Sequence, residues 1–501
     1  MSLLFNDISA ASPIVLIMMT AMLVLLGDSC IAGWRQSKYA SPGVSLLGIA
    51  IALASSAHAL NRTVPAFHNS LRMDSFSEAC NLILLIVAAL AVFLAMTYLE
   101  NRQLNIGEYY VLVLFSTAGG MLMAAANDLI VLFIAIEILS VALYVLSGFA
   151  RKEARSEEAA LKYFLLGAFA AGFLLYGIAL IYGGSAGAVG NGGTTNLTVL
   201  TAFLSDLPNH APSAMFMSGV ALVLVGLAFK AALVPFHMWT PDVYEGAPTS
   251  VTAYMACAAK IGAFGAIMRV FYALSPVHAY WLIAIQGLAI LTMFGGNILA
   301  ITQDNVKRML AYSSVAHAGY LLVAVSAACG GRVEAQGPAF SALTFYLLAY
   351  SLMTMGSFGV LILLTKRGHD CQTMNDLKGL LRRDPQAAYI MLVFMLSLGG
   401  FPLTMGFVGK LYIFNAALLA NQAWLAVALA LASVISIYYY LKVVWTMCFQ
   451  EPDKEASLGR ALSPGPVMAT VFTSLIFSVL LGIAPRIAQP LMDAATALMR
   501  P

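Results

Sequence analysis

Long apolar segments, separated by short polar stretches, repeat along almost the whole chain of 501 residues. A helix needs ~20 apolar residues to cross the hydrocarbon core of a bilayer. Fourteen segments approach or exceed this length: 13–33, 43–60, 75–99, 107–126, 128–149, 158–183, 214–235, 248–274, 279–302, 306–328, 339–365, 387–419, 423–448 and 465–484. The pattern predicts an all-α integral membrane protein with about 14 transmembrane helices.

Composition supports this assignment. Hydrophobic residues make up 61% of the chain and charged residues 10%, whereas soluble domains average ~45–50% and ~25%. These values exclude a soluble enzyme, a disordered protein and a nucleic-acid-binding protein. The six cysteines form no CxxC pair, and no Gly-rich nucleotide-binding motif is present. We therefore expect no metal and no cofactor in this chain.

Positive charges predict the orientation of the chain. Loops after odd-numbered segments carry 15 of them: Arg35, Lys38, Arg102, Arg151, Lys152, Arg155, Lys307, Arg308, Lys366, Arg367, Lys378, Arg382, Arg383, Lys454 and Arg460. The opposite side carries 6: Arg62, Arg72, Arg269, Arg332, Arg486 and Arg500. Because cytoplasmic loops are enriched in lysine and arginine, both termini are predicted on the periplasmic side of a bacterial inner membrane.

Several ionisable residues lie inside apolar segments, where each charge costs roughly 2.5–3.5 kcal/mol at a helix centre. They are Glu137, Lys162, Lys230, Lys260, His317, Lys410 and Lys442. Such residues usually line an ion path. The alternatives are a structural acid or ion pair, a neutral histidine bonded to a carbonyl, and, for Lys162 and Lys442, a side chain that reaches the membrane surface.

Lysine and glutamate together are suited to moving protons. A lysine in water holds its proton with a pKa of ~10.4. Removal from water disfavours the charged form, and a nearby carboxylate favours it again. A conformational change that moves a carboxylate therefore switches a lysine between accepting and releasing a proton.

Two segments are predicted to be broken helices. Proline interrupts a helix, and Pro235 follows Lys230 in the seventh segment, whereas Pro402 precedes Lys410 in the twelfth. Broken helices five segments apart run in opposite directions, which is typical of inverted repeats in transporters. We predict one membrane domain, 1–501, in four parts: N-terminal helices 1–4 (1–126), a first repeat of helices 4–8 (107–274), a second of helices 9–13 (279–448) and a C-terminal helix (465–501).

Five sequence blocks resemble the antiporter-like membrane subunits of respiratory complex I, in particular the subunit N family of bacterial NADH:quinone oxidoreductase. They are PFHMWTPDVYEGAPT (235–249), NDL (127–129), EAALKYF (158–164), AYSSVAHAGY (311–320) and GFVGK (406–410). The blocks span about 127–412, and the fourteen-segment layout extends the resemblance over the whole chain. Many relatives carry a second proline near Pro402, which this chain lacks.

The resemblance implies a role for each candidate in proton transfer. Glu137 would pair with Lys230, Lys260 would connect two half-channels, and Lys410 would serve the exit side. Lys162 and His317 would belong to the same polar axis.

The resemblance also implies the surroundings of the chain. FMN, Fe–S clusters and quinone would be held by other subunits, and the partners would be subunits M, K and J and the lateral helix of subunit L. Three alternatives bear on this assignment. Subunit M generally has glutamate where this chain has Lys410; Mrp-type sodium/proton antiporter subunits share both broken-helix lysines; and a purely bracing subunit would not need the buried charges.

Overall fold

The structure, a computed structural model, describes residues 2–31, 33–34, 37–188, 192–206, 212–365, 370–451 and 465–496. Six of the charges used to predict the orientation lie outside these residues: Arg35, Lys366, Arg367, Lys454, Arg460 and Arg500.

Twelve helices in this part of the chain are long and apolar enough to cross a membrane. They are α2 (Ser12–Cys30), α3 (Ala40–Ala59), α4 (Ser75–Arg102), α5 (Gly107–Ala125), α6 (Leu129–Ser147), α7 (Ala154–Gly184), α11 (Thr249–Ala273), α12 (His278–Ile301), α13 (Val306–Cys329), α14 (Val333–Leu363), α19 (Ala423–Phe449) and α20 (Gly465–Ile483). Each coincides with a predicted segment. Of the two remaining segments, 214–235 holds α9 (Ala214–Lys230), and α10 (Trp239–Gly246) follows after its end; 387–419 is split into α17 (Pro385–Gly399) and α18 (Met405–Leu419). The predicted all-α, multi-pass membrane fold is confirmed.

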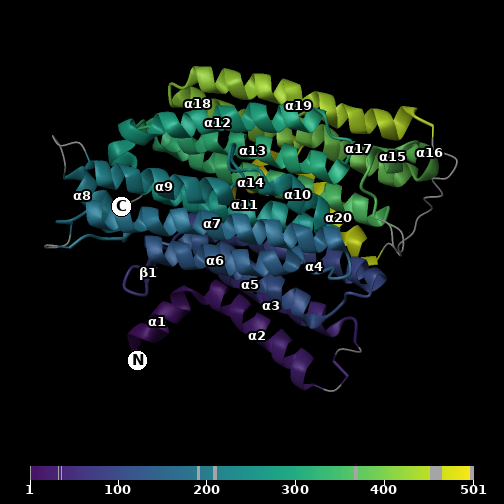
Figure 1. Cartoon of the computed structure of the whole chain (residues 1–501), viewed down its shortest axis with the longest axis horizontal. Helices are drawn as coiled ribbons and strands as arrows, with labels where there is room; N and C mark the ends of the chain where they lie inside the picture. The colour runs from purple at the N-terminus through teal and green to yellow at the C-terminus, as the bar shows by residue number, and fades with distance from the viewer. Residues whose placement is uncertain are drawn as a thin grey trace.

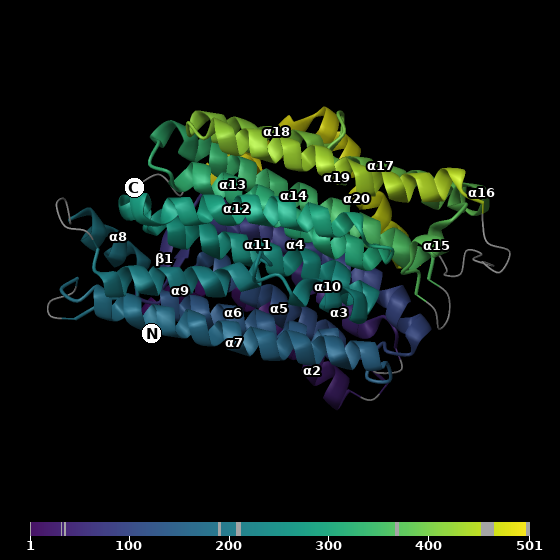
Figure 2. The same ribbon diagram turned by 45° about the horizontal axis from the view of Figure 1, so that its top comes forward.

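Short elements that the apolar pattern did not predict lie at the two ends of the bundle. They are α1 (Ser2–Ala10), α8 (Leu197–Ser205), α15 (Met374–Leu377), α16 (Leu380–Arg383), α21 (Gln489–Ala495), two 3₁₀ turns (Ser275–Val277 and Pro485–Ala488) and the antiparallel strands β1 (Val64–Ala66) and β2 (Leu71–Met73). The elements α1, β1 and α8 lie at one end, left in Figure 1, and α10, α15 and α16 lie toward the other (Figures 1 and 2).

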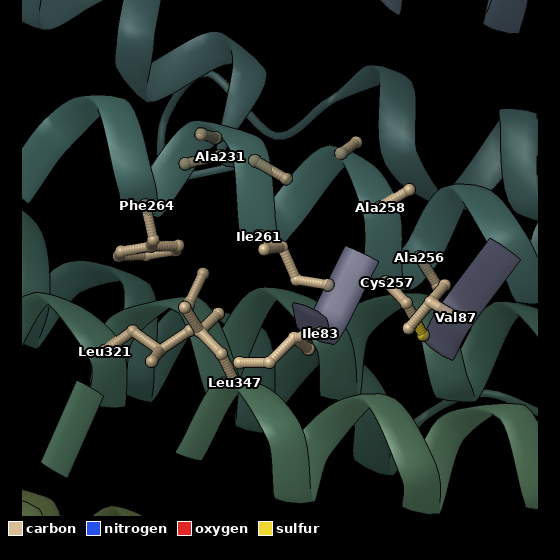
Figure 3. Close-up of a cluster of buried hydrophobic side chains, with 14 of the residues drawn as sticks. Ile83, Val87, Ala231, Ala256, Cys257, Ala258, Ile261, Phe264, Leu321 and Leu347 are labelled. Carbon is tan, nitrogen blue, oxygen red and sulfur yellow. The ribbon is translucent and has the colours of Figure 1, made fainter. Parts of the chain in front are cut away.

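The centre of the bundle consists of α11, α13 and α14. The apolar stretches of α11 and α13 are buried throughout, whereas α7, α12 and α19 keep many apolar side chains exposed. In the core, Ile261 and Phe264 of α11 pack among Leu321 of α13, Leu347 of α14 and Ile83 of α4 (Figure 3). Because α11 carries apolar side chains around its whole circumference, it has to be buried on every side.

Two isolated β-bridges support the predicted inverted repeats. Asp128, which caps α6, pairs with Asn196 before α8, and Asn305, which caps α13, pairs with Thr373 before α15. These helices are the fifth and tenth membrane segments, at the same place in each repeat. Because α8 and α15 lie at opposite ends of the bundle (Figure 1), the two bridges have the relation expected of inverted repeats.

The first helix break begins earlier than Pro235. Helix α9 ends at Lys230, and Ala232 adopts a left-handed conformation with a φ of 59°. A continuous helix would need the N–H of residue 235 to bond the carbonyl of Ala231, and proline has no N–H. The segment therefore leaves the helix five residues before the proline, and Lys230 becomes the last helical residue.

The second break lies where the sequence predicts it. Helix α17 ends at Gly399, and Gly400 takes a φ of 86°, which glycine adopts without a steric penalty. The N–H groups of Gly400 and Phe401 both bond the carbonyl of Leu396 and so satisfy the end of the helix. Helix α18 starts three residues after Pro402.

Candidate functional site

The ammonium group of Lys230 is buried at the first helix break, with 4% of the residue exposed. Its Nζ donates to Ser140 Oγ at 2.9 Å and to Tyr163 Oη at 3.2 Å. The same nitrogen lies 5.3 Å from the centre of the Tyr163 ring and 6.0 Å from that of Tyr144. Among the described residues, the hydrogen-bond partners of this lysine thus come from α6 and α7.

Glu137 lies on α6 three residues before Ser140, on the face that Lys230 approaches. It is half-buried and lines a narrow crevice together with Ser140, Tyr144 and Lys230. No ion pair of 4 Å or shorter joins Glu137 to Lys230 in the described structure, since the ammonium bonds Ser140 and Tyr163 instead. The predicted partners are therefore neighbours that line one crevice.

Lys260 lies near the middle of α11 and has 4% of its surface exposed. Its Nζ donates to the carbonyl of Ser314 on α13 and lies 4.5 Å from the centre of the Tyr350 ring. No carboxylate of the described residues lies within ion-pair distance of it. A carbonyl and an aromatic face are the partners of this lysine, and neither carries a formal charge.

His317 is the centre of a tyrosine cluster in the second repeat. Its Nδ1 lies 2.7 Å from Tyr346 Oη and its Nε2 lies 3.1 Å from Tyr440 Oη. The ring of Tyr350, which stacks over the Lys260 ammonium, is 5.1 Å from the imidazole. The alternative of a histidine bonded to a carbonyl is wrong, because hydroxyl groups occupy both ring nitrogens.

Lys410 is buried at the second helix break, with 6% exposed. Its Nζ donates to the carbonyls of Leu398 at 3.2 Å and Gly399 at 3.0 Å, the last two residues of α17. Free carbonyls at a helix C-terminus carry partial negative charge and stabilise a cation. The ring of Tyr320 lies 5.1 Å from the same nitrogen, so Lys410 adjoins the tyrosine cluster.

Lys162 lies apart from these buried groups. Its ammonium is 2.7 Å from Glu158 and 2.8 Å from Asp242, and 42% of the side chain is exposed. Arg308 binds the same Asp242 at 2.7 Å. Burial alone raises the pKa of Asp242, but hydrogen bonds from Lys162 and Arg308 outweigh it and hold the pKa below its ordinary value. Lys162 therefore belongs to a charged cluster near one end of the bundle.

Lys442 also reaches the end of its helix. Its Nζ donates to the carbonyl of Gln303 at 3.3 Å and to Asp304 at 3.1 Å, and Asp304 is 89% exposed. Lys442 thus bonds groups at the exposed end of its helix, as the interpretation of a side chain that reaches the surface expects.

Aromatic side chains connect the two halves of the site. The rings of Tyr163 and Trp239 stack at 4.4 Å, and those of Trp239 and Tyr244 lie 6.4 Å apart. Tyr244 Oη lies 3.4 Å from Ser314 Oγ, on the residue whose carbonyl binds Lys260. A row of polar groups, linked between Tyr163 and Tyr244 by the ring of Trp239, thus runs from Lys230 through Lys260 and the His317 cluster to Lys410.

The sequence analysis missed the tyrosines and six further ionisable residues that are buried in the described structure: Asp28, Asp74, Glu78, Arg269, Lys307 and Asp370. A hydroxyl group both donates and accepts a hydrogen bond, and six tyrosines contact the lysines or His317: Tyr144, Tyr163, Tyr320, Tyr346, Tyr350 and Tyr440. Lys307 and Arg269 were counted as loop charges, but the structure buries both in helices, where Lys307 donates to the carbonyl of Ala247 at 2.7 Å. Glu78 in α4 is 1% exposed.

The charged cluster at the end with α10, α15 and α16 continues around Asp370. This carboxylate binds Arg102 at 2.5 Å and accepts hydrogen bonds from Tyr98 at 2.9 Å and Thr249 at 3.2 Å. Burial alone raises the pKa of Asp370, but Lys307 and Arg102 outweigh it and hold the pKa below its ordinary value of 3.8.

The chain is similar to known membrane subunits over its full length. The family described as "NADH:quinone oxidoreductase/Mrp antiporter, TM" matches residues 126–436. NADH-quinone oxidoreductase subunit N of Trichlorobacter lovleyi is 40% identical, over 98% of each chain. Subunit N 1 of Sorangium cellulosum is 43% identical, over 95% of this chain and 96% of the relative.

Two solved structures share the fold. A chain of respiratory complex I from Thermus thermophilus, with bound aureothin, is 33% identical with a TM-score of 0.79, covering 96% of this chain and 99% of that one. A chain of the Mrp complex from Dietzia has a TM-score of 0.80 at 21% identity, covering 97% of each chain, and is a likeness of fold alone. With relatives at this identity matched end to end, the chain belongs to the subunit N family of NADH-quinone oxidoreductases, within the antiporter-like membrane proteins.

Proposed function

We propose that this chain is a proton-translocating, non-redox membrane subunit of an NADH:quinone oxidoreductase. In this proposal it moves protons through its buried lysines while NADH oxidation and quinone reduction take place in other subunits. The observation that supports it most is the row of polar groups between the two helix breaks, from Lys230 through Lys260 and His317 to Lys410.

The environment of each lysine suits reversible protonation. Lys230, Lys260 and Lys410 bond to hydroxyl or carbonyl oxygens and form no ion pair in the described residues. A carboxylate partner would hold the proton, whereas neutral acceptors and burial leave the charged and neutral forms closer in free energy. Glu137, beside Lys230 but not bonded to it, is the carboxylate whose movement would change that balance.

In this proposal Lys162 supplies protons to the row of buried lysines from the end of the bundle that holds the charged cluster. Its ammonium already donates to Asp242 of α10. Helix α10 directly follows the first break, so the charged cluster and Lys230 are joined by one short stretch of chain. The cytoplasmic side is then the end with α10, α15 and α16, and both termini are periplasmic.

The partners in this proposal are other membrane subunits of the complex, with M, K and J as neighbours and the lateral helix of L alongside. FMN, Fe–S clusters and quinone belong to other subunits. A sodium/proton antiporter subunit of the Mrp type remains the second candidate, supported by the shared fold. Against it stands the full-length identity to proteins named subunit N.

The test compares Lys230→Ala with Lys442→Ala in inverted membrane vesicles. Lys442 is a matched control because it is also a lysine in a membrane helix but bonds at the surface. We expect NADH-driven proton uptake and NADH:quinone turnover to fall together in Lys230→Ala, with the complex still assembled, and both to stay normal in Lys442→Ala. Normal uptake and turnover in both variants would contradict the proposal.

A further inference from the structure

Glu78 is a buried carboxyl group that lies outside both repeats. It belongs to the first turn of α4, is 1% exposed, and lines a cavity of about 280 Å³. The cavity is bounded by α1, α3 and β1, and its lining includes the polar residues Asn6, Ser12, Ser55 and His58. It therefore lies at the end of the bundle opposite α10, α15 and α16 (Figure 1).

Only one oxygen of this carboxyl group has hydrogen-bond donors. Ser56 Oγ donates to Glu78 Oε2, and Asn81 Nδ2 donates to the same oxygen at 3.2 Å. Glu78 Oε1 and Asn81 Oδ1 are both buried and have no donor among the described residues. Two neighbouring acceptors without a donor are unfavourable in a buried site.

A proton on Glu78 supplies the missing donor. A carboxylic acid offers one O–H and one C=O, and an amide offers one N–H₂ and one C=O, so an acid and an amide complement each other in a pair of hydrogen bonds. The bond from Asn81 Nδ2 to Glu78 Oε2 is already one of that pair. A carboxylate cannot form the second bond, because it is an acceptor only.

The charges near Glu78 leave its carboxyl group without a cation. Asp74, one turn earlier, is bound by Arg269 at 2.8 Å and adds a like charge. On the cavity side, the guanidinium of Arg62 lies 2.9 Å from His58 Nε2 and is engaged there. No ion pair of 4 Å or shorter joins Glu78 to any described base. An unpaired buried carboxylate is far costlier than a neutral acid.

We propose that Glu78 carries an exchangeable proton, taken up through the cavity from the end of the molecule that holds α1 and β1. The ligand of this site is a proton and not a metal cation, because among the buried side-chain oxygens of the described residues here only Glu78 Oε1 and Asn81 Oδ1 lack a donor, and a cation needs several oxygen ligands. The site is separate from the lysine row, and it does not depend on how that row works.

Carbodiimide labelling of the intact complex in membranes tests the proposal. A protonated carboxyl group adds across one C=N bond of dicyclohexylcarbodiimide: its proton moves to nitrogen, its oxygen bonds the central carbon, and migration of the acyl group to nitrogen gives a stable N-acylurea with no leaving group. Mass spectrometry of the peptide that contains Glu78 reads the label. We expect labelling at neutral pH that declines as the pH rises, and its complete loss in Glu78→Gln.

A second variant keeps the carboxyl group and closes its access. Ser55→Phe places a large side chain in the cavity that Ser55 lines, and we expect it to reduce labelling of Glu78 several-fold with turnover unchanged. Three results would overturn the proposal: no label on Glu78 in the unaltered chain at any pH, unreduced labelling in Ser55→Phe, or protection by sodium ions at constant pH, which would indicate a cation site. None of these bears on the effect of Lys230→Ala, so the two proposals fail independently.

Discussion

The buried pair of Arg269 and Asp74 allows a quantitative prediction. Arg269 lies near the end of α11 and donates to both oxygens of Asp74, at 2.9 and 2.8 Å, and to the carbonyl of Ala124 at 2.7 Å. The side chains are 5% and 1% exposed. Asp74 also accepts from the N–H of Ser77 and so caps α4. The perturbation is Arg269→Met, which preserves the volume of the side chain but removes the charge.

The expected loss follows from what the substitution leaves behind. Asp74 keeps its cap hydrogen bond and the more distant Arg72, whose Nε lies 3.7 Å from Asp74 Oδ2, but loses both bonds from Arg269. Removing one partner of a buried ion pair costs about 3–5 kcal/mol, because the other charge stays buried without its main compensation, and Arg72 places the expected loss toward the lower end of this range. Replacing both partners removes that uncompensated charge, so Asp74→Asn combined with Arg269→Met should cost less than the sum of the single changes.

The assay is equilibrium unfolding of the purified chain in mixed micelles with increasing sodium dodecyl sulfate, for the four members of the double-mutant cycle. We expect a coupling free energy of at least about 2 kcal/mol between the two positions, near the upper part of the usual range. A loss below about 1 kcal/mol for Arg269→Met, or simple additivity, would refute the reasoning that this pair is desolvated and mutually dependent.

Three further predictions concern the second repeat and the charged cluster. His317→Phe removes the partner of two tyrosine hydroxyls and should destabilise the chain by about 1–3 kcal/mol and lower NADH-driven turnover; stability and turnover matching those of the unaltered chain would argue against the cluster. In Gly406→Ala, the added methyl group would lie 1.8 Å from the carbonyl oxygen of Ser397, whereas in the control Gly287→Ala it would meet nothing within 4 Å. The free energy of unfolding in detergent should fall by about 1–3 kcal/mol in Gly406→Ala and stay unchanged in Gly287→Ala. Because the pKa of Asp370 is held below 3.8, its stabilising charge is present above that pH and is lost as the pH falls through the lowered value. The free energy of unfolding should therefore depend less on pH in the acid range in Asp370→Asn than in the unaltered chain. An identical acid profile for the two chains would contradict this.

The apolar pattern alone predicts most of the fold. A membrane helix must form all its backbone hydrogen bonds internally and present apolar side chains to lipid, so each span is a long apolar segment that is easily recognised in the sequence. The short helices α8 and α15 were missed because they are only 9 and 4 residues long. The break was placed at Pro235, which lacks the N–H, whereas the helix already ends at Lys230, one residue before the Ala231 carbonyl that this N–H would have bonded.

The candidate site was only partly predictable, because its lysines are recognisable in the sequence and its tyrosines are not. Charged residues in apolar segments are rare enough to be recognised one by one, which identified Lys230, Lys260 and Lys410. Tyr346 and Tyr440 resemble ordinary core aromatics in the sequence, and their position on either side of His317 appears only when α13, α14 and α19 are packed together.

Two loop assignments failed for a related reason. Lys307 and Arg269 stand at the ends of apolar segments, where a charge usually faces water. Their partners are the carbonyl of Ala247, just after α10, and the carboxylate of Asp74, just before α4. Both are distant in the sequence, so nothing local indicated burial.

The central claim is that protons pass between the repeats through Lys260, which lies between the two helix breaks. The most direct measurement is NADH-driven proton uptake into inverted vesicles that carry Lys260→Ala, together with NADH:quinone turnover and the amount of assembled complex. The account predicts normal assembly with uptake and turnover both strongly reduced, and normal values for Lys442→Ala. Uptake and turnover at the level of the unaltered chain in Lys260→Ala would contradict it.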